Sequence, residues 1–170
     1  MLATLIIVLS VAVDQLTKWW ARSALPVHPG ASYPLWEGVF HLTYVRNDGA
    51  AFSILQGQRW LFIVFTSLII LGFLIYLWRK KPAPLLKVAM ALIVGGAAGN
   101  LIDRIRFGYV EDMFDFRAIN FAIFNVADCC VVVGTILLAA WILIFEARQA
   151  KRHGEASATG AAEAPEERHE

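Results

Sequence analysis

Residues 60–78 read WLFIVFTSLIILGFLIYLW, a run that contains no charged side chain. Crossing the hydrocarbon core of a bilayer takes about 20 apolar residues, because an α-helix advances about 1.5 Å per residue. The run begins at Trp60 and ends at Trp78, and tryptophan rings favour the membrane–water interface. The sequence therefore predicts a helix that spans a membrane.

Three further segments are long and apolar enough to span a bilayer, at about residues 2–22, 85–104 and 121–145. The composition agrees, since 58% of the 170 residues are hydrophobic and only 17% are charged, with a mean hydropathy of +0.58. A soluble domain carries more charge. We predict an all-α membrane protein, with a bundle of four transmembrane helices over residues 1–147 and a disordered tail over residues 148–170.

Basic residues predict the orientation of the spans. The short link after the second span reads RKKP at residues 79–82, and Arg148, Lys151 and Arg152 follow the fourth span. Cytoplasmic loops are enriched in lysine and arginine, so we expect both termini and the tail in the cytoplasm. No basic residue precedes the first apolar segment and no small-residue cleavage pattern follows it, so it is expected to be a retained span rather than a signal peptide.

The unusual polar residues gather at one end of the predicted spans. The end of span one, the start of span two, the end of span three and the start of span four must share one face of the membrane. The residues found at these places are Asp14, Lys18, Asn47, Asp48, Asn100, Asp103, Arg104, Asp112, Asn125 and Asp128. Charged residues that served only to terminate the helices would occur at both faces of the membrane. We therefore predict a functional site near the outer interface.

Asp112 and Asp128 are the candidate catalytic residues. A carboxylate that enters hydrocarbon costs about 2.5–3.5 kcal/mol on insertion scales, so chains usually keep one there for a function. Two neighbouring carboxyl groups cannot both ionise easily, so one keeps a proton while the other activates a water, as aspartic peptide hydrolysis requires. Each also has a plainer interpretation: Asp128, three residues after Asn125, could cap a helix, and Asp112 could be a solvated loop residue.

Other chemistries have less support. The sequence contains neither a Gly-x-Ser-x-Gly elbow nor a His-Glu-x-x-His zinc motif, and we expect no metal or other cofactor. Cys129 and Cys130 are expected to be small packing residues. A net charge of +1 argues against a protein that binds nucleic acid. The alternative is that the protein is a small proton-coupled membrane transporter. Such a protein would have polar residues at all depths of the bilayer and two halves of similar sequence.

Five polar residues surround the candidate pair in the predicted spans. Asp14 and Lys18, four residues apart, are expected to form a structural ion pair. Asn100, Asp103 and Arg104 share one side of the third span. They form either an interfacial ion pair or a polar wall that holds the carboxylates.

Two local patterns concern the scaffold. Gly95 and Gly99 have the spacing of close helix packing. Between the first two spans, the alternation over residues 39–45 predicts a strand, and Asn47-Asp48-Gly49 predicts a turn after it.

Five motifs together resemble those of one family. They are Asp14-Gln15-x-Thr17-Lys18, Asn47-x-Gly49-Ala50-Ala51-Phe52-Ser53, Gly95-Gly96-Ala97-x-Gly99-Asn100-Leu101-x-Asp103-Arg104, Gly108-x-Val110-x-Asp112 and Phe124-Asn125-x-Ala127-Asp128. In order and spacing the chain resembles the bacterial lipoprotein signal peptidases (signal peptidase II), from residue 14 to about residue 134. The resemblance implies an aspartic endopeptidase of the bacterial inner membrane that cuts signal peptides from diacylglyceryl-modified prolipoproteins, just before the lipidated cysteine.

The resemblance also assigns roles by position. Asp112 and Asp128 would be the catalytic dyad, near the outer leaflet. The residues that would contact substrate or support the dyad are Asn47, Arg104 and Asn125; those that would hold the site together are Asp14, Lys18, Asn100 and Asp103. A small extracytoplasmic cradle of β-strands and a short helix would cover the site between spans one and two. We expect a monomer in contact with membrane lipids, and inhibition by the cyclic peptide globomycin.

The chain departs from the family pattern beside Asp112. Glu111 stands where the family usually has an apolar residue, and Met113 stands where it usually has phenylalanine. Like-charge repulsion from Glu111 is expected to raise the pKa of the dyad.

Overall fold

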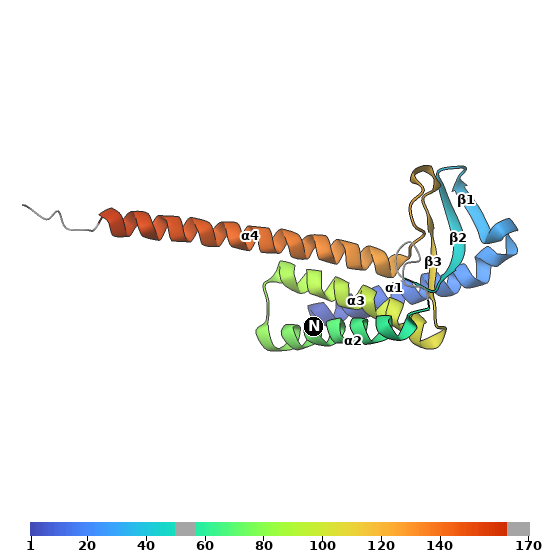
Figure 1. Ribbon diagram of the computed structural model, residues 1–170, viewed down its shortest axis with the longest axis horizontal. Helices are drawn as coiled ribbons and strands as arrows, with labels where there is room; N and C mark the ends of the chain where they lie inside the picture. The colour runs from blue at the N-terminus through green and yellow to red at the C-terminus, as the bar shows by residue number, and fades with distance from the viewer. Residues whose placement is uncertain (50–56, 163–170) are drawn as a thin grey trace, which may run out of the picture.

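The computed structural model describes residues 1–49 and 57–162. This part of the chain forms four long helices and a small three-stranded sheet (Figure 1). The helices are α1 (Leu2–Ala24), α2 (Arg59–Lys80), α3 (Pro84–Arg106) and α4 (Val126–Ala162). Each contains a stretch long and apolar enough to cross a membrane. The four predicted spans are confirmed, and the protein is a multi-pass membrane protein.

The fourth helix begins later than the sequence predicts. The span was expected from residue 121, but α4 starts at Val126. The preceding segment is extended, because Phe124 forms a β-bridge with Phe114 and their backbones exchange hydrogen bonds of 2.9 and 3.1 Å. Hydropathy cannot distinguish an apolar strand from the start of an apolar helix.

The far end of α4 also differs from the expectation. Residues 148–162 continue the helix, whereas a disordered tail was expected from residue 148; residues 163–170 lie outside the described residues. Five of these fifteen residues are alanine and two are arginine, and both residue types favour helix. Extending an existing helix also requires no new nucleus.

Helix α3 is the centre of the bundle, since it packs against α1, α2 and α4. Its glycines allow the close approach that their spacing predicts. A Cβ on Gly95 would lie 2.6 Å from Ser10 of α1, and one on Gly99 would lie 2.5 Å from Oδ2 of Asp14. On the side facing α4, a Cβ on Gly96 would overlap the carbonyl oxygen of Ala127. The outward faces of α1, α2 and α4 carry exposed apolar side chains, as lipid-facing surfaces do.

The sheet lies at one end of the bundle (Figure 1). Its strands, β1 (Ser32–Trp36), β2 (Phe40–Asn47) and β3 (Val110–Asp115), are antiparallel in the order β1-β2-β3. Strand β2 confirms the predicted strand, whereas β3 was not predicted. Two short 3-10 helices, Leu25–Val27 and Pro29–Ala31, follow α1; the described residues 32–49 and 57–58 contain no further helix, and residues 50–56 lie outside the described residues.

A small apolar core fixes the sheet to the bundle. Met113 of β3 is buried together with Ala21 of α1 and Leu25, which follows that helix. The core holds β3 against the end of α1. The strand that carries Asp112 is thereby placed beside the starts and ends of the spans where the sequence predicts polar residues.

Candidate active site

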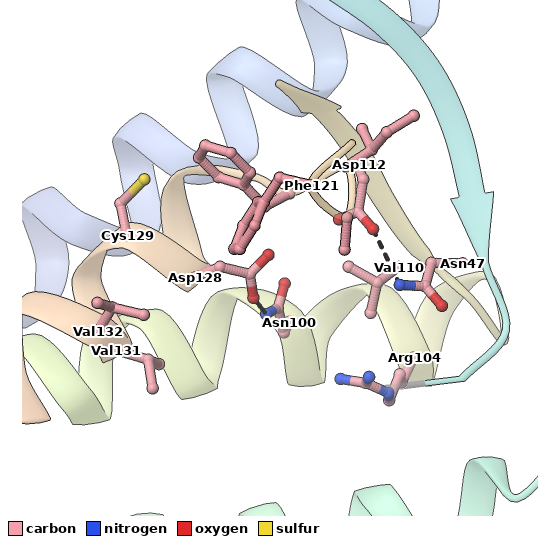
Figure 2. A pocket seen from close by; sticks show the side chains of 13 residues that line it. Asn47, Asn100, Arg104, Val110, Asp112, Phe121, Asp128, Cys129, Val131 and Val132 are labelled. Carbon is pink, nitrogen blue, oxygen red and sulfur yellow. Dashed lines mark hydrogen bonds between the residues drawn. The ribbon is translucent and has the colours of Figure 1, made fainter. Parts of the chain in front are cut away.

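Asp112 and Asp128 line one cavity of about 420 Å³ (Figure 2). Asp112 comes from β3, and Asp128 lies in the first turn of α4. The structure therefore brings together two carboxylates that are 16 positions apart in the sequence. A second cavity of about 380 Å³ adjoins it, and Asn47 and Asp112 line both.

Asn125 contacts both carboxylates. Its side-chain Nδ2 donates to Oδ1 of Asp112 at 2.6 Å, and its backbone N–H donates to Oδ2 of Asp128 at 3.1 Å. The residue is fully buried, so its donors have little competition from water. A single residue thus forms hydrogen bonds with both carboxyl groups.

Asp112 is a buried carboxyl group on the sheet. Only 2% of the residue is exposed, and Oδ2 accepts a hydrogen bond from Nδ2 of Asn47 at 3.0 Å (Figure 2). Burial, together with the nearby charge of Asp128, raises the pKa of Asp112 to about 7, while the hydrogen bonds from Asn47 and Asn125 oppose the rise. Near neutral pH, therefore, a large fraction of Asp112 keeps its proton.

Asp128 is held by donors from two elements. Nδ2 of Asn100 on α3 donates to its Oδ1 at 2.8 Å, and the Asn125 backbone donates to its Oδ2. The Asp128 backbone N–H in turn donates to Oδ1 of Asn125 at 2.9 Å, which completes a reciprocal capping box at the start of α4. The helix dipole also favours a negative charge in this turn. The capping interpretation of Asp128 is therefore confirmed, and its catalytic role stays a prediction.

Lys18 is the centre of a buried network beneath the two carboxylates. Its Nζ lies 2.9 Å from Asp14, 2.8 Å from Asp103 and 2.8 Å from Oδ1 of Asn100. Lys18 is 1% exposed, and Asp14 and Asp103 are fully buried. The predicted pair of Asp14 with Lys18 is confirmed, and Asp103 joins it. A buried charge is tolerated only when it is paired in this way.

The network also ties the helices together. Asp14 Oδ1 accepts the backbone N–H of Ala127 at 2.9 Å, so α1 caps the start of α4. Gln15 donates to Asp14, to the carbonyl oxygen of Gly99 and to Asp103 at 2.9–3.3 Å. No role was predicted for Gln15 from the sequence. Its position beside Asp14, within the first of the five motifs, is the feature that could have indicated a role in this network.

Arg104 lines the same cavity from the end of α3 (Figure 2). Its Nη2 donates to the carbonyl oxygen of Gly49 at 3.0 Å, and its Cζ lies 4.7 Å from the centre of the Phe62 ring on α2. Arg104 therefore places a positive charge at the cavity without forming an ion pair with either aspartate among the described residues. Of the three polar residues at the end of α3, Asn100 bonds a carboxylate of the pair, Asp103 pairs with Lys18, and a role of Arg104 in the site stays a prediction.

Comparison with known proteins agrees with this arrangement. The family model described as Signal peptidase (SPase) II matches residues 6–144. The lipoprotein signal peptidase of Clostridioides difficile is 45% identical over 148 residues, which are 87% of this chain and 99% of that protein. That of Halothermothrix orenii is 44% identical over 138 residues, 81% of this chain and 92% of that protein.

The chain belongs to the signal peptidase II family. It is therefore an aspartic peptidase, and the transporter alternative is not favoured. A solved bacterial membrane enzyme at 2.3 Å resolution has the same fold, with a TM-score of 0.76 and 32% identity over 83% of this chain and 87% of that one.

One departure from the signal peptidase II pattern lies beside Asp112. Glu111 precedes Asp112 on β3, and successive side chains of a strand point to opposite faces. Glu111 accordingly turns away from the cavity and accepts a hydrogen bond from the Tyr44 hydroxyl at 2.7 Å. Glu111 therefore lies on the strand face opposite to Asp112, and the expected like-charge repulsion stays a prediction. Met113, on the same face as Glu111, fills the core against α1.

The apolar walls of the signal peptidase II cavity were not predicted. They consist of residues from the segment before α4 and from its first two turns: Phe121, Ala122, Ile123, Phe124, Cys129, Val131 and Val132, with Val110 of β3. Cys129, expected to be a packing residue, lines the cavity wall instead. Hydropathy marks all these residues as apolar but cannot show which of them face a cavity.

Proposed function

We propose that this signal peptidase II cleaves the signal peptide from diacylglyceryl-modified prolipoproteins, just before the lipidated cysteine, with Asp112 and Asp128 as its catalytic dyad. The observation that carries the proposal is the link through Asn125, which holds both carboxyl groups at one cavity. Family membership supports the reaction class.

The environments of the two carboxyl groups favour different roles. Asp112 is buried and its pKa is raised to about 7, so it is the proton donor. Asp128 accepts two N–H donors in the first turn of a helix and lines the same cavity as Asp112, so it is the general base. Two carboxyl groups in different environments divide acid and base work in this way.

The reaction follows from these roles. Asp128 takes a proton from a water molecule as the water oxygen bonds to the scissile carbonyl carbon, and Asp112 gives its proton to the carbonyl oxygen. The resulting tetrahedral diol then breaks its C–N bond. Asp128 passes its proton to the leaving amine, and one diol hydroxyl returns a proton to Asp112. Both carboxyl groups end in their starting states.

The other residues support the dyad. Asn47, Asn100 and Asn125 orient the two carboxyl groups through the hydrogen bonds described above. Arg104 is placed to bind a carbonyl group of the substrate backbone at the cavity. The residues that hold the scaffold beneath are Asp14, Lys18 and Asp103.

The cavity suits a substrate held by acyl chains. Its polar groups lie at the sheet end of the spans, and its apolar wall continues along α4 to Val131 and Val132. A lipidated cysteine would keep the scissile bond at the membrane interface, beside the dyad. We place this end at the outer leaflet of the bacterial inner membrane, with both termini in the cytoplasm, because the basic link 79–82 lies at the opposite end. We expect a monomer that globomycin inhibits by occupying the cavity.

The decisive experiment compares two substrates in detergent. The wild-type enzyme is incubated with one prolipoprotein, either diacylglyceryl-modified or unmodified, and cleavage is followed as a gel shift. We expect cleavage of the lipidated form alone, persisting with a metal chelator and blocked by globomycin. Equal cleavage of both forms would contradict the substrate assignment. Loss of activity on chelation, restored by zinc, would contradict the aspartic mechanism.

A further inference from the structure

Four arginines surround the turn that joins α3 to β3. The Cζ atoms of Arg22 and Arg106 lie 4.7 and 5.0 Å from the centre of the same Phe107 ring. The Phe107 ring stacks on Tyr109 with centroids 5.8 Å apart, and Arg46 lies 5.2 Å from the Tyr109 ring. Guanidinium groups stack favourably on aromatic faces, so the rings hold these charges close together.

Arg59 is the fourth arginine of the group. Its Nη2 donates to the carbonyl oxygen of Ile105 at 2.9 Å, and its Nη1 would lie 3.7 Å from a Cβ on Gly108. We call the whole surface the arginine–aromatic patch; it consists of Arg22, Arg46, Arg59, Arg106, Phe107 and Tyr109.

The patch has an excess of positive charge. Among the described residues, Glu111 is the one carboxylate within ion-pair distance, with its Oε1 3.6 Å from Nε of Arg22. Glu111 is fully buried beneath the patch, whereas Arg46 and Arg106 are exposed. Arg117, in the 3-10 helix Arg117–Ile119 after β3, is different because Asp115 pairs with it at 2.8 Å. The patch therefore presents guanidinium groups that lack a matching anion within the described protein.

The position of the patch matches the depth of lipid headgroups. Arg22 and Arg106 lie in the last turns of α1 and α3, and Arg59 is the first residue of α2. Beside them, the apolar side chains of Ile105 and Trp60 are 55% and 71% exposed. The surface thus places positive charge at the interface and apolar contacts directly next to it.

We propose that the arginine–aromatic patch binds the phosphate of an anionic phospholipid headgroup, whose acyl chains lie along the exposed apolar side chains at the span ends. Arginine suits this partner because its planar guanidinium can donate two hydrogen bonds to one phosphate. The described lining of the cavity contains none of the four arginines, so the lipid site is separate from the dyad. A bound lipid would hold the sheet end of the protein at the headgroup level.

Titration with dioleoylphosphatidylglycerol tests this proposal independently of cleavage. The full-length protein in dodecylmaltoside micelles is titrated with this lipid, and native mass spectrometry gives the dissociation constant of the first bound molecule. The test variant is Arg46→Gln with Arg106→Gln, both exposed. The matched control is Arg79→Gln with Lys80→Gln, which removes two exposed charges at the opposite end of the spans. Thermal unfolding checks that both variants fold.

We expect the test variant to lose affinity about tenfold or more, since each cation near an anionic lipid contributes roughly a fivefold factor. The control should change less than about twofold on the same scale. Dioleoylphosphatidylcholine should bind all three proteins equally, and glycerol 3-phosphate should compete weakly. Unchanged affinity in the test variant, or an equal loss in the control, would overturn the proposal. Full competition by glycerol 3-phosphate would identify a free-phosphate site, and selective binding of an acidic peptide would identify a peptide site; either would refute the lipid assignment.

Discussion

Nδ2 of Asn125 lies 2.6 Å from Oδ1 of Asp112, a contact that joins the segment before α4 to the strand β3. The backbone of Asn125 donates to Asp128 as well. One buried residue therefore links the two carboxyl groups. Because of this link, we expect the carboxyl groups to behave as one catalytic unit.

The first prediction concerns pH. The pKa of Asp112 is raised to about 7, so its protonated form dominates below that pH and is lost as the pH rises. If Asp112 is the acid, kcat/KM should fall above about pH 7, tenfold per pH unit for a single ionisation. Asn47→Ala removes a donor that stabilises the ionised form, so the pKa rises further and the fall moves to higher pH. Rate profiles between about pH 5 and pH 9 measure this. A shift to lower pH would be inconsistent with the role of Asn47.

A second prediction uses Glu111 as the matched comparison. Glu111 is adjacent to Asp112 in sequence but faces Tyr44, away from the cavity. Glu111→Gln should therefore leave the high-pH limb of the rate profile where it is in the wild-type enzyme. A shift of that limb to lower pH in the Gln variant would show that Glu111 does raise the pKa of Asp112 by like-charge repulsion, as expected from the sequence.

A third prediction concerns Lys18. Replacing it with methionine leaves Asp14 and Asp103 buried without their cation. Breaking a buried ion pair in this way costs about 3–5 kcal/mol. We expect a large fall in the thermal unfolding temperature in detergent, together with loss of activity. Lys80→Met, at an exposed position at the end of α2, is the control and should unfold like wild type. Equal unfolding temperatures for the two variants would show that the Lys18 network does not stabilise the bundle.

A fourth prediction tests the packing of α3. A Cβ on Gly96 would overlap the Ala127 carbonyl oxygen and lie 2.9 Å from Cγ2 of Val131. Overpacking of this kind costs about 1–3 kcal/mol, so Gly96→Ala should lower the unfolding temperature and move the start of α4, with a loss of activity. Gly72→Ala on α2 is the matched control, because its Cβ would meet no atom within 4 Å among the described residues. A neutral Gly96→Ala would mean that α4 can shift at no cost.

Much of the fold could be predicted from the sequence because the membrane imposes a simple constraint. A span must be about 20 apolar residues long, and alternation of four spans then places the polar residues at one end. Asp14, Lys18, Asn100 and Asp128 meet there because each is near a span end on the same side.

The strand β3 could not be predicted in the same way. Residues 110–115 read VEDMFD, in which acids occupy both faces of the strand. Their burial depends on partners that are distant in sequence: Asn47 and Asn125 for Asp112, and Tyr44 for Glu111. Side chains alternate along a strand, so Glu111 and Asp112 point to opposite faces of β3. This orientation cannot be predicted unless residues 110–115 are first known to form a strand.

The most direct test of the dyad is the activity of Asp112→Asn, Asp128→Asn and the double variant on a diacylglyceryl-modified prolipoprotein. Residues that act as one unit are strongly non-additive, so each single variant should lose as much kcat as the double variant. All three should unfold cooperatively, which separates lost chemistry from lost structure. If either single variant cleaved the substrate at the wild-type rate, the assignment of Asp112 and Asp128 as the catalytic dyad would be contradicted.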